Sequence, residues 1–121
     1  MTWVNAYVRW RGEFEAILDP RLYRIEWVDG LLANGRAQLF ASPNAAVVTE
    51  LKTYPTGAIE VHGLLAAGDI TEIRDIIRPQ LEAFGRENGA IGVLVESREG
   101  WSRLLRGHGY EPYQTSVRKE L

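Results

Sequence analysis

Apolar residues recur at intervals of three and four along the N-terminal part of the chain, which is the period of a helix with one buried face. This spacing predicts a helix over residues 4–18, which ends before Pro20 because the residue preceding a proline avoids the helical region. The same spacing predicts a second, shorter helix over residues 22–33, and Gly35 follows it in a turn signal. Residues 1–36 are therefore expected to form a helical N-terminal part.

Beyond this part the apolar period changes to two, which is typical of strands with one buried face. Alternating and β-branched residues predict strands over residues 37–41, 45–54 and 58–65, separated by short turns. Residues 90–95 form a continuous apolar run, as in a strand that is covered on both faces.

A single apolar stripe predicts a long helix between the last two of these strands. Asp69 stands at the N-cap position of this helix, and Glu72 follows at the spacing of a capping box. Pro79 removes one backbone hydrogen bond and is expected to kink the helix. A short helix over residues 99–106 and a last strand over residues 110–121 complete the pattern. The stripe consists of Ile70, Ile73, Ile76, Ile77, Leu81 and Phe84.

This order of elements predicts the α/β class, with one compact domain over residues 1–121. Residues 37–121 would form a mixed twisted sheet with two crossover helices, and helices would cover both faces of the sheet. The composition, 45% apolar and 25% charged, is that of a soluble globular protein.

Charge and residue types exclude several classes of function. The formal net charge is −2 and no basic segment stands out, so nucleic acid is not an expected partner. The chain has no cysteine, which excludes disulfides and thiolate chemistry, and its two histidines give no zinc motif. Neither a signal peptide nor a membrane-spanning run is apparent, so a cytoplasmic location without membrane contact is expected.

The strand–helix–strand–helix order of residues 57–110 resembles the acyl-CoA-binding half of the GCN5-related N-acetyltransferase (GNAT) family. In that family a loop of the form Arg/Gln-x-x-Gly-x-Gly/Ala joins the first strand to the first helix, and its amides hold the cofactor pyrophosphate. The resemblance extends over residues 45–121 and implies a GNAT-like fold. Aligned from the helix end, the six loop positions are Asp69, Ile70, Thr71, Glu72, Ile73 and Arg74.

These six loop positions contain no glycine, although close approach of a backbone to a ligand favours glycine. Asp69 and Glu72 would also place two carboxylates beside a doubly charged phosphate group. We interpret the two residues as a helix cap and expect a degenerate site without a bound cofactor. Binding of acetyl-CoA by a noncanonical loop is the alternative.

The family's usual proton donor is a tyrosine four residues before a Gly-Phe step. Here Gly109-Tyr110 resembles that step, and the position four before it is Leu105, which cannot donate a proton. The remaining candidates for acid–base catalysis are Glu60 and His62, which share one face of a strand. A solvated strand face is the interpretation that we favour for this pair.

The C-terminal half further resembles small GNAT-like proteins of tailed bacteriophages. This resemblance implies a non-catalytic protein in the host cytoplasm or the virion, with phage structural proteins as partners in virion assembly. An acyl-CoA-dependent N-acetyltransferase and a regulator that binds a host protein are the alternatives. A homo-oligomer would suit the exposed last strand. The matching residues are Glu96-Ser97-Arg98-Glu99-Gly100-Trp101, Gly109-Tyr110 and Lys119-Glu120-Leu121.

Overall fold

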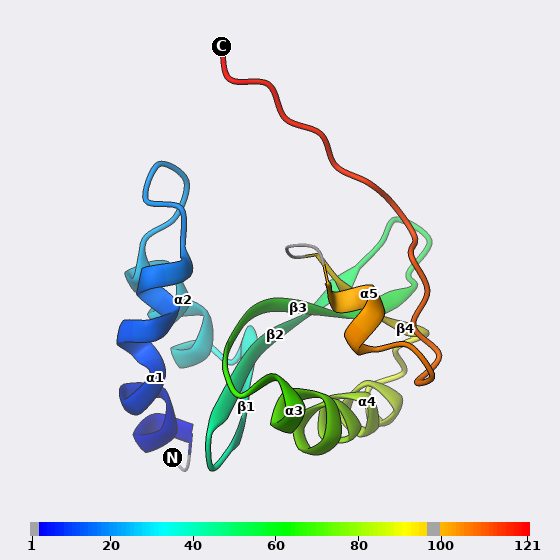
Figure 1. Ribbon diagram of the computed structural model, residues 1–121, viewed down its shortest axis with the longest axis horizontal. Helices are drawn as coiled ribbons and strands as arrows, with labels where there is room; N and C mark the ends of the chain where they lie inside the picture. Colours follow the sequence, from blue (N-terminus) through cyan, green and yellow to red (C-terminus); the bar gives the residue numbers. More distant parts are fainter. Residues whose placement is uncertain (1–2, 97–99) are drawn as a thin grey trace.

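A computed structural model describes residues 3–96 and 100–121 (Figure 1). Two helices come first, then three strands, a helical segment in three parts, a short strand and a last short helix. The elements are α1 (Trp3–Ile17), α2 (Ile25–Ala33), β1 (Ala37–Ser42), β2 (Ala45–Thr53), β3 (Ile59–Gly68), α3 (Ile70–Glu72), the π-helical turn η1 (Ile73–Ile77), α4 (Arg78–Glu87), β4 (Gly92–Val95) and α5 (Trp101–Leu104).

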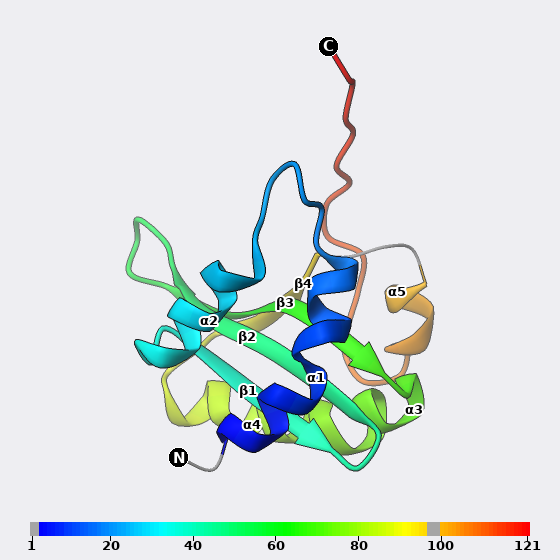
Figure 2. The same cartoon turned by 90° about the vertical axis from the view of Figure 1, so that its left-hand side faces the viewer.

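Within the described residues the strands form one mixed sheet of four, in the order β1-β2-β3-β4. The first three strands are antiparallel, and β4 runs parallel to β3, with pairs from Glu60↔Gly92 to Gly63↔Val95. Helices α1 and α2 cover one face, and α3, η1 and α4 cover the other (Figures 1 and 2). The predicted fold class, a single α/β domain with a mixed sheet, is confirmed.

Strand β2 is buried on both faces because its residues alternate between two cores. Ala46 and Val48 pack against α1 and α2, while Ala45 and Val47 pack against η1 and α4. Gly85 of α4 lies so close to β3 that an added Cβ would come within 2.8 Å of the Val61 side chain. The sheet therefore packs between two helical layers, and β3 packs closely against α4.

The irregularity expected at Pro79 is a π-helical turn rather than a simple break. In the π pattern the amide of residue 79 would donate to the carbonyl of Arg74, but proline has no N–H. The Arg78 guanidinium replaces that donor, with Nε 2.9 Å from the Arg74 carbonyl oxygen. The proline is therefore accommodated inside one continuous helical segment.

The C-terminal part differs from the prediction. Residues 110–121 are all described and contain no strand, and they lead away from the domain in Figure 1. A strand needs a neighbouring strand for its backbone hydrogen bonds, and among the described residues this segment pairs with none. The helix expected over residues 99–106 is confined to α5, and Glu99 lies outside the described residues. In the described ranges, no helix is long and apolar enough to cross a membrane.

Candidate functional site

The candidate site lies where β3 ends and the helical segment begins, at the six positions Asp69 to Arg74. The Asp69 carboxylate accepts hydrogen bonds from the first-turn amides of Thr71 (2.8 Å) and Glu72 (3.2 Å). These are backbone donors that would otherwise be free to face an anion. The chain therefore caps this helix N-terminus with its own carboxylate.

Glu72 does not complete the predicted capping box, because its side chain turns to the β1–β2 turn instead. Its carboxylate accepts hydrogen bonds from Ser42 Oγ (2.6 Å) and from the backbone amide (2.9 Å) and Nδ2 (2.8 Å) of Asn44. The hydrogen bond from Ser42, with those from Asn44, lowers the pKa of Glu72 below its ordinary value. A second negative charge is thus fixed beside the helix N-terminus.

The only cation among the six positions is Arg74, and it is engaged by its neighbour. Its Nε and Nη2 lie 2.7 and 2.9 Å from the two carboxylate oxygens of Asp75. Ile70 is exposed, whereas Ile73 is buried in the core. The structure therefore brings the six positions into one turn, and the one guanidinium among them is bound to Asp75.

Glu60 and His62 lie on β3, as the sequence predicted, and each is held by polar neighbours. Tyr54 Oη donates a 2.6 Å hydrogen bond to Glu60 Oε1. The two ring nitrogens of His62 lie 3.3 Å from Glu50 Oε1 and 3.4 Å from Glu96 Oε1. The His62 side chain is only 15% exposed, so His62 is less solvated than the strand face that we favoured from the sequence.

Sequence reasoning did not find Tyr54, Glu50 and Glu96 as members of this cluster. Glu50 pairs with His62 across the antiparallel strands, so correct registration of the hairpin would have revealed it. Glu96 follows β4, and its approach to His62 depends on the parallel pairing of two strands that are distant in sequence. The hydrogen bond to Glu60 raises the pKa of Tyr54 to about 12.

A narrow opening lies between β3 and β4 beside this cluster. The strands pair only as far as Gly63 and Val95, and the β2–β3 register shifts at the same level, between Val48 and Thr49. The cavity there has a volume of about 60 Å³, far below the roughly 300–1,000 Å³ of most ligand sites. Its apolar lining includes Val47, Ile73, Leu81, Val93, Trp101 and Leu105.

The residue at the position of the family's proton donor is apolar and buried. Leu105 is 5% exposed and lines the narrow cavity. The nearby Tyr110 donates its hydroxyl proton to Glu82 Oε2 (2.8 Å), and burial raises the pKa of this tyrosine. Among the described residues, no cluster of histidine and carboxylate side chains has the geometry of a metal site.

No protein-family model matches the chain. No curated protein matches it either. Solved structures do resemble it, and three of them cover nearly the whole domain. A ribosomal-protein-alanine N-acetyltransferase from Brucella melitensis superposes with a TM-score of 0.67 at 10% identity, over 99% of this chain and 94% of that one.

The other two structures agree with the first. An acetyltransferase from Trypanosoma brucei superposes with a TM-score of 0.65 at 10% identity, over 99% of this chain and 94% of its own. A predicted acetyltransferase from Clostridium acetobutylicum, solved with acetyl-CoA, superposes with a TM-score of 0.63 at 12% identity, over 99% of this chain and 91% of that one. The chain therefore has the GNAT fold, and identities this low show the fold alone.

Proposed function

We propose that this GNAT-fold protein acts through protein–protein contacts and does not transfer an acyl group. One observation carries the proposal: the Asp69 carboxylate occupies the first-turn amides that a pyrophosphate would need. A phosphate at that turn would have to displace a carboxylate whose hydrogen bonds are local and cost little entropy to form.

The charges at the turn oppose a phosphate as well. Asp69 and Glu72 would each lie near the incoming group, and a like charge at about 5 Å costs roughly 3 kcal/mol at an effective dielectric of about 20. Arg74 offsets little of this, because its guanidinium already binds Asp75. The amides of Thr71 and Glu72 are thus already occupied, and the one cation of the turn is already paired.

The partner class follows from the resemblance of the C-terminal half to small GNAT-like proteins of tailed bacteriophages. On that resemblance we propose phage structural proteins as the partners, either during virion assembly or in the virion. Co-purification with portal, coat or tail proteins from infected cells is the expected result, and absence from both assembling and mature particles would contradict this part of the proposal.

Calorimetric titration with acetyl-CoA tests the absence of a cofactor site. We expect no binding tighter than about 1 mM, whereas a dissociation constant below about 10 μM, or about −7 kcal/mol, would overturn the proposal. The Asp69→Gly variant frees the first-turn amides and should bind acetyl-CoA more tightly than the wild type. Glu87→Gln removes an exposed carboxylate from α4 without freeing those amides or Arg74 and should not.

An acyl-CoA-dependent N-acetyltransferase is the second candidate, and the Glu60 cluster beside the β3–β4 opening favours it. In this alternative Glu60 acts as the general base that takes a proton from an amine. Mass spectrometry of amines incubated with acetyl-CoA tests it. The N-acetyltransferase replaces the non-catalytic protein as the proposed function if two results are found. Amines must be acetylated, and Glu60→Gln must lower the rate of acetylation about 100-fold or more while Glu87→Gln leaves it unchanged.

A further inference from the structure

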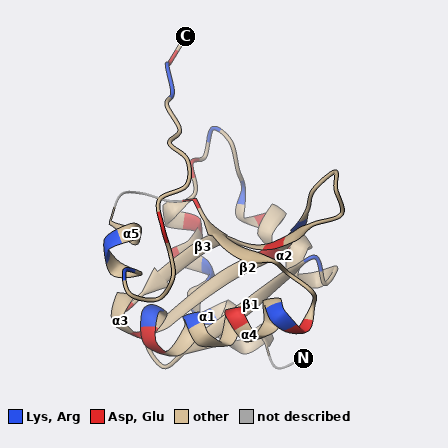
Figure 3. Ribbon diagram, turned by 90° about the vertical axis from the view of Figure 1, so that its right-hand side faces the viewer, with Lys and Arg blue, Asp and Glu red and all other residues tan. Residues whose placement is uncertain are grey.

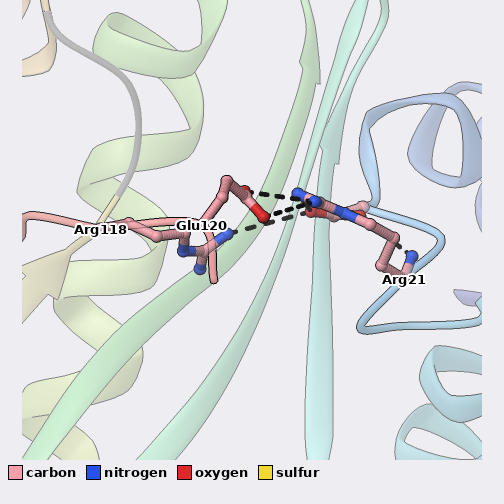
Figure 4. A network of polar contacts seen from close by, with 4 residues as sticks. Arg21, Arg118 and Glu120 are labelled. Carbon is pink, nitrogen blue, oxygen red and sulfur yellow. Dashed lines mark hydrogen bonds and ion pairs between the residues drawn. The ribbon is translucent and has the colours of Figure 1, made fainter.

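The C-terminal segment, residues 111–121, is attached to the domain at two separate points. Just before its beginning, the Tyr110 hydroxyl donates a 2.8 Å hydrogen bond to Glu82 on α4. At its end, Arg21 Nη1 lies 3.1 Å from a carboxylate oxygen of Glu120 (Figure 4). Because α4 and the α1–α2 loop belong to opposite helical layers, the segment spans from one layer to the other (Figures 1 and 2).

Between these two points the segment is not held by polar contacts. Residues 111–117 form no hydrogen bond and no ion pair with any other residue that the structure describes. Their side chains are open to solvent, with Tyr113 77% and Val117 94% exposed. A segment that is fixed at both ends and has few contacts between them moves more easily than the elements that it connects.

The unattached part of the segment forms one wall of a groove. Residues 111–116 face β4 and α5 across this groove, which has a volume of about 1030 Å³. Glu60 and Glu96 of the acidic cluster line the same groove. Its volume is at the upper end of the roughly 300–1,000 Å³ that most ligand sites have. The position of residues 111–116 therefore decides how accessible Glu60 is to a molecule of that size.

The contact at the end of the segment consists of four charged side chains, two from each side. Arg21 Nε and Nη2 lie 3.2 and 3.0 Å from the carboxylate of Asp19, and this pairing places Nη1 of the same guanidinium beside Glu120. Arg118 lies 4.0 Å from Asp19. The hydrogen bonds from Arg21 lower the pKa of Asp19, so this carboxylate stays charged in mild acid.

These four groups are exposed to water, which makes their contact reversible. Figure 3 shows the oppositely charged residues at the tip of the C-terminal segment, well outside the sheet. Ion pairs in such surroundings stabilise weakly, and salt screens them. The end of the segment can therefore separate from the α1–α2 loop while the core stays folded.

We propose that residues 111–121 are a strap that closes one side of the groove and that the contact of Asp19 and Arg21 with Arg118 and Glu120 is its latch. In the latched state the strap forms the outer wall of the groove. In the released state it swings away from β4 about Tyr110, and the groove opens. The proposal does not depend on whether coenzyme A binds.

Distance measurement by pulsed electron spin resonance tests the latch. The chain has no cysteine, so Ser116→Cys on the strap and Glu26→Cys on the exposed side of α2 give two unique sites for spin labels. At about 20 mM salt we expect one narrow population of distances. Glu120→Gln, or about 0.5 M salt, should lower the ratio of latched to released protein about two- to fivefold and add a second, broader population.

Glu111→Gln is the matched control, because it removes the same charge from the strap and Glu111 forms no ion pair with a described residue. It should leave the distances unchanged. A broad population in the unaltered strap at low salt would overturn the latch. A narrow population that Glu120→Gln does not change would overturn it as well.

A thiol inside the groove tests whether the strap controls access. Leu94→Cys, made alone, places the one cysteine of the chain on β4 in the groove lining. Its reaction with a bulky maleimide should be about two- to fivefold faster when Glu120→Gln is added, and unchanged when Glu111→Gln is added. Equal rates in all three proteins would overturn the closing of the groove. Circular dichroism checks that each variant is folded. Neither readout involves acetyl-CoA, so this proposal and the proposed function fail separately.

Discussion

The carboxylate of Glu72 binds both amide groups of Asn44, with 2.9 Å to the backbone nitrogen and 2.8 Å to Nδ2. This contact ties the first turn of the helical segment to the turn between β1 and β2. It fixes the position of the first helical turn, and it keeps a negative charge where the GNAT resemblance would place a phosphate.

We expect Glu72→Gln to lower the free energy of unfolding at neutral pH, because the amide oxygen is a weaker acceptor than the carboxylate. The pKa of Glu72 is lowered in the folded protein from 4.5, so the stabilisation is fully present above that value. It is lost as the pH falls through the lowered pKa. Urea unfolding at about pH 7 and about pH 3 should show the difference between the wild type and the variant shrinking in acid.

Glu87→Gln is the control for this effect, since Glu87 is an exposed residue near the end of α4. It should leave stability nearly unchanged at both pH values. A Glu72→Gln protein as stable as the wild type at neutral pH would show that the contact with Asn44 is not stabilising.

Gly68 lies at a place where no other residue fits. Its φ of +96° is left-handed, and an added Cβ would overlap the carbonyl oxygen of Asn44 and come within 2.8 Å of the Trp10 ring. We expect Gly68→Ala to lower the free energy of unfolding by about 3 kcal/mol or more, from backbone strain and overpacking together. Gly12→Ala, in open space within α1, should raise it by about 0.5–1 kcal/mol. Thermal denaturation of both variants compares them directly.

Tyr54 should titrate later than an exposed tyrosine. The hydrogen bond to Glu60 raises its pKa to about 12, because ionisation would place a phenolate beside a carboxylate. The difference in ultraviolet absorbance between the wild type and Tyr54→Phe isolates this group during a pH titration. Glu60→Gln should bring the midpoint back toward the ordinary value of 10.0. A midpoint unchanged by that substitution would contradict the hydrogen bond.

Tyr7 joins α1 to α2 through Asp29. Its hydroxyl donates a 2.6 Å hydrogen bond to Asp29 Oδ1, and Arg11 binds the same carboxylate through Nε and Nη2. We expect Tyr7→Phe to cost about 1.5–3 kcal/mol of unfolding free energy, as for other hydrogen bonds to a charged group. Tyr23→Phe alters a half-exposed ring and should change stability by less than about 0.5 kcal/mol. Equal losses in the two variants would count against the role of Asp29.

Much of the fold could be predicted because burial imposes a period on the sequence. The apolar spacing in residues 4–18 placed Tyr7, Trp10 and Phe14 on one buried face of α1. The helix boundary at Asp69 was equally accessible, since a carboxylate that caps its own turn needs only residues two and three positions away. Interactions of this range are encoded locally.

The candidate site could be predicted only in part, for the opposite reason. The partners of Glu72 lie about thirty residues earlier in the chain, and His62 is placed between Glu50 of β2 and Glu96 beyond β4. No local pattern specifies these neighbours, because they meet only when strands distant in sequence pair in one register.

The C-terminal segment shows the difference between what a local sequence pattern predicts and what the tertiary structure decides. By itself the sequence determined the helical faces and the cap at Asp69, and it predicted a last strand over residues 110–121. The tertiary structure decided that this segment pairs with no strand among the described residues and that Glu72 binds the β1–β2 turn instead of closing a capping box. The physical reason is that periodicity reports which side chains seek burial, whereas pairing and contact depend on what the folded chain places beside them.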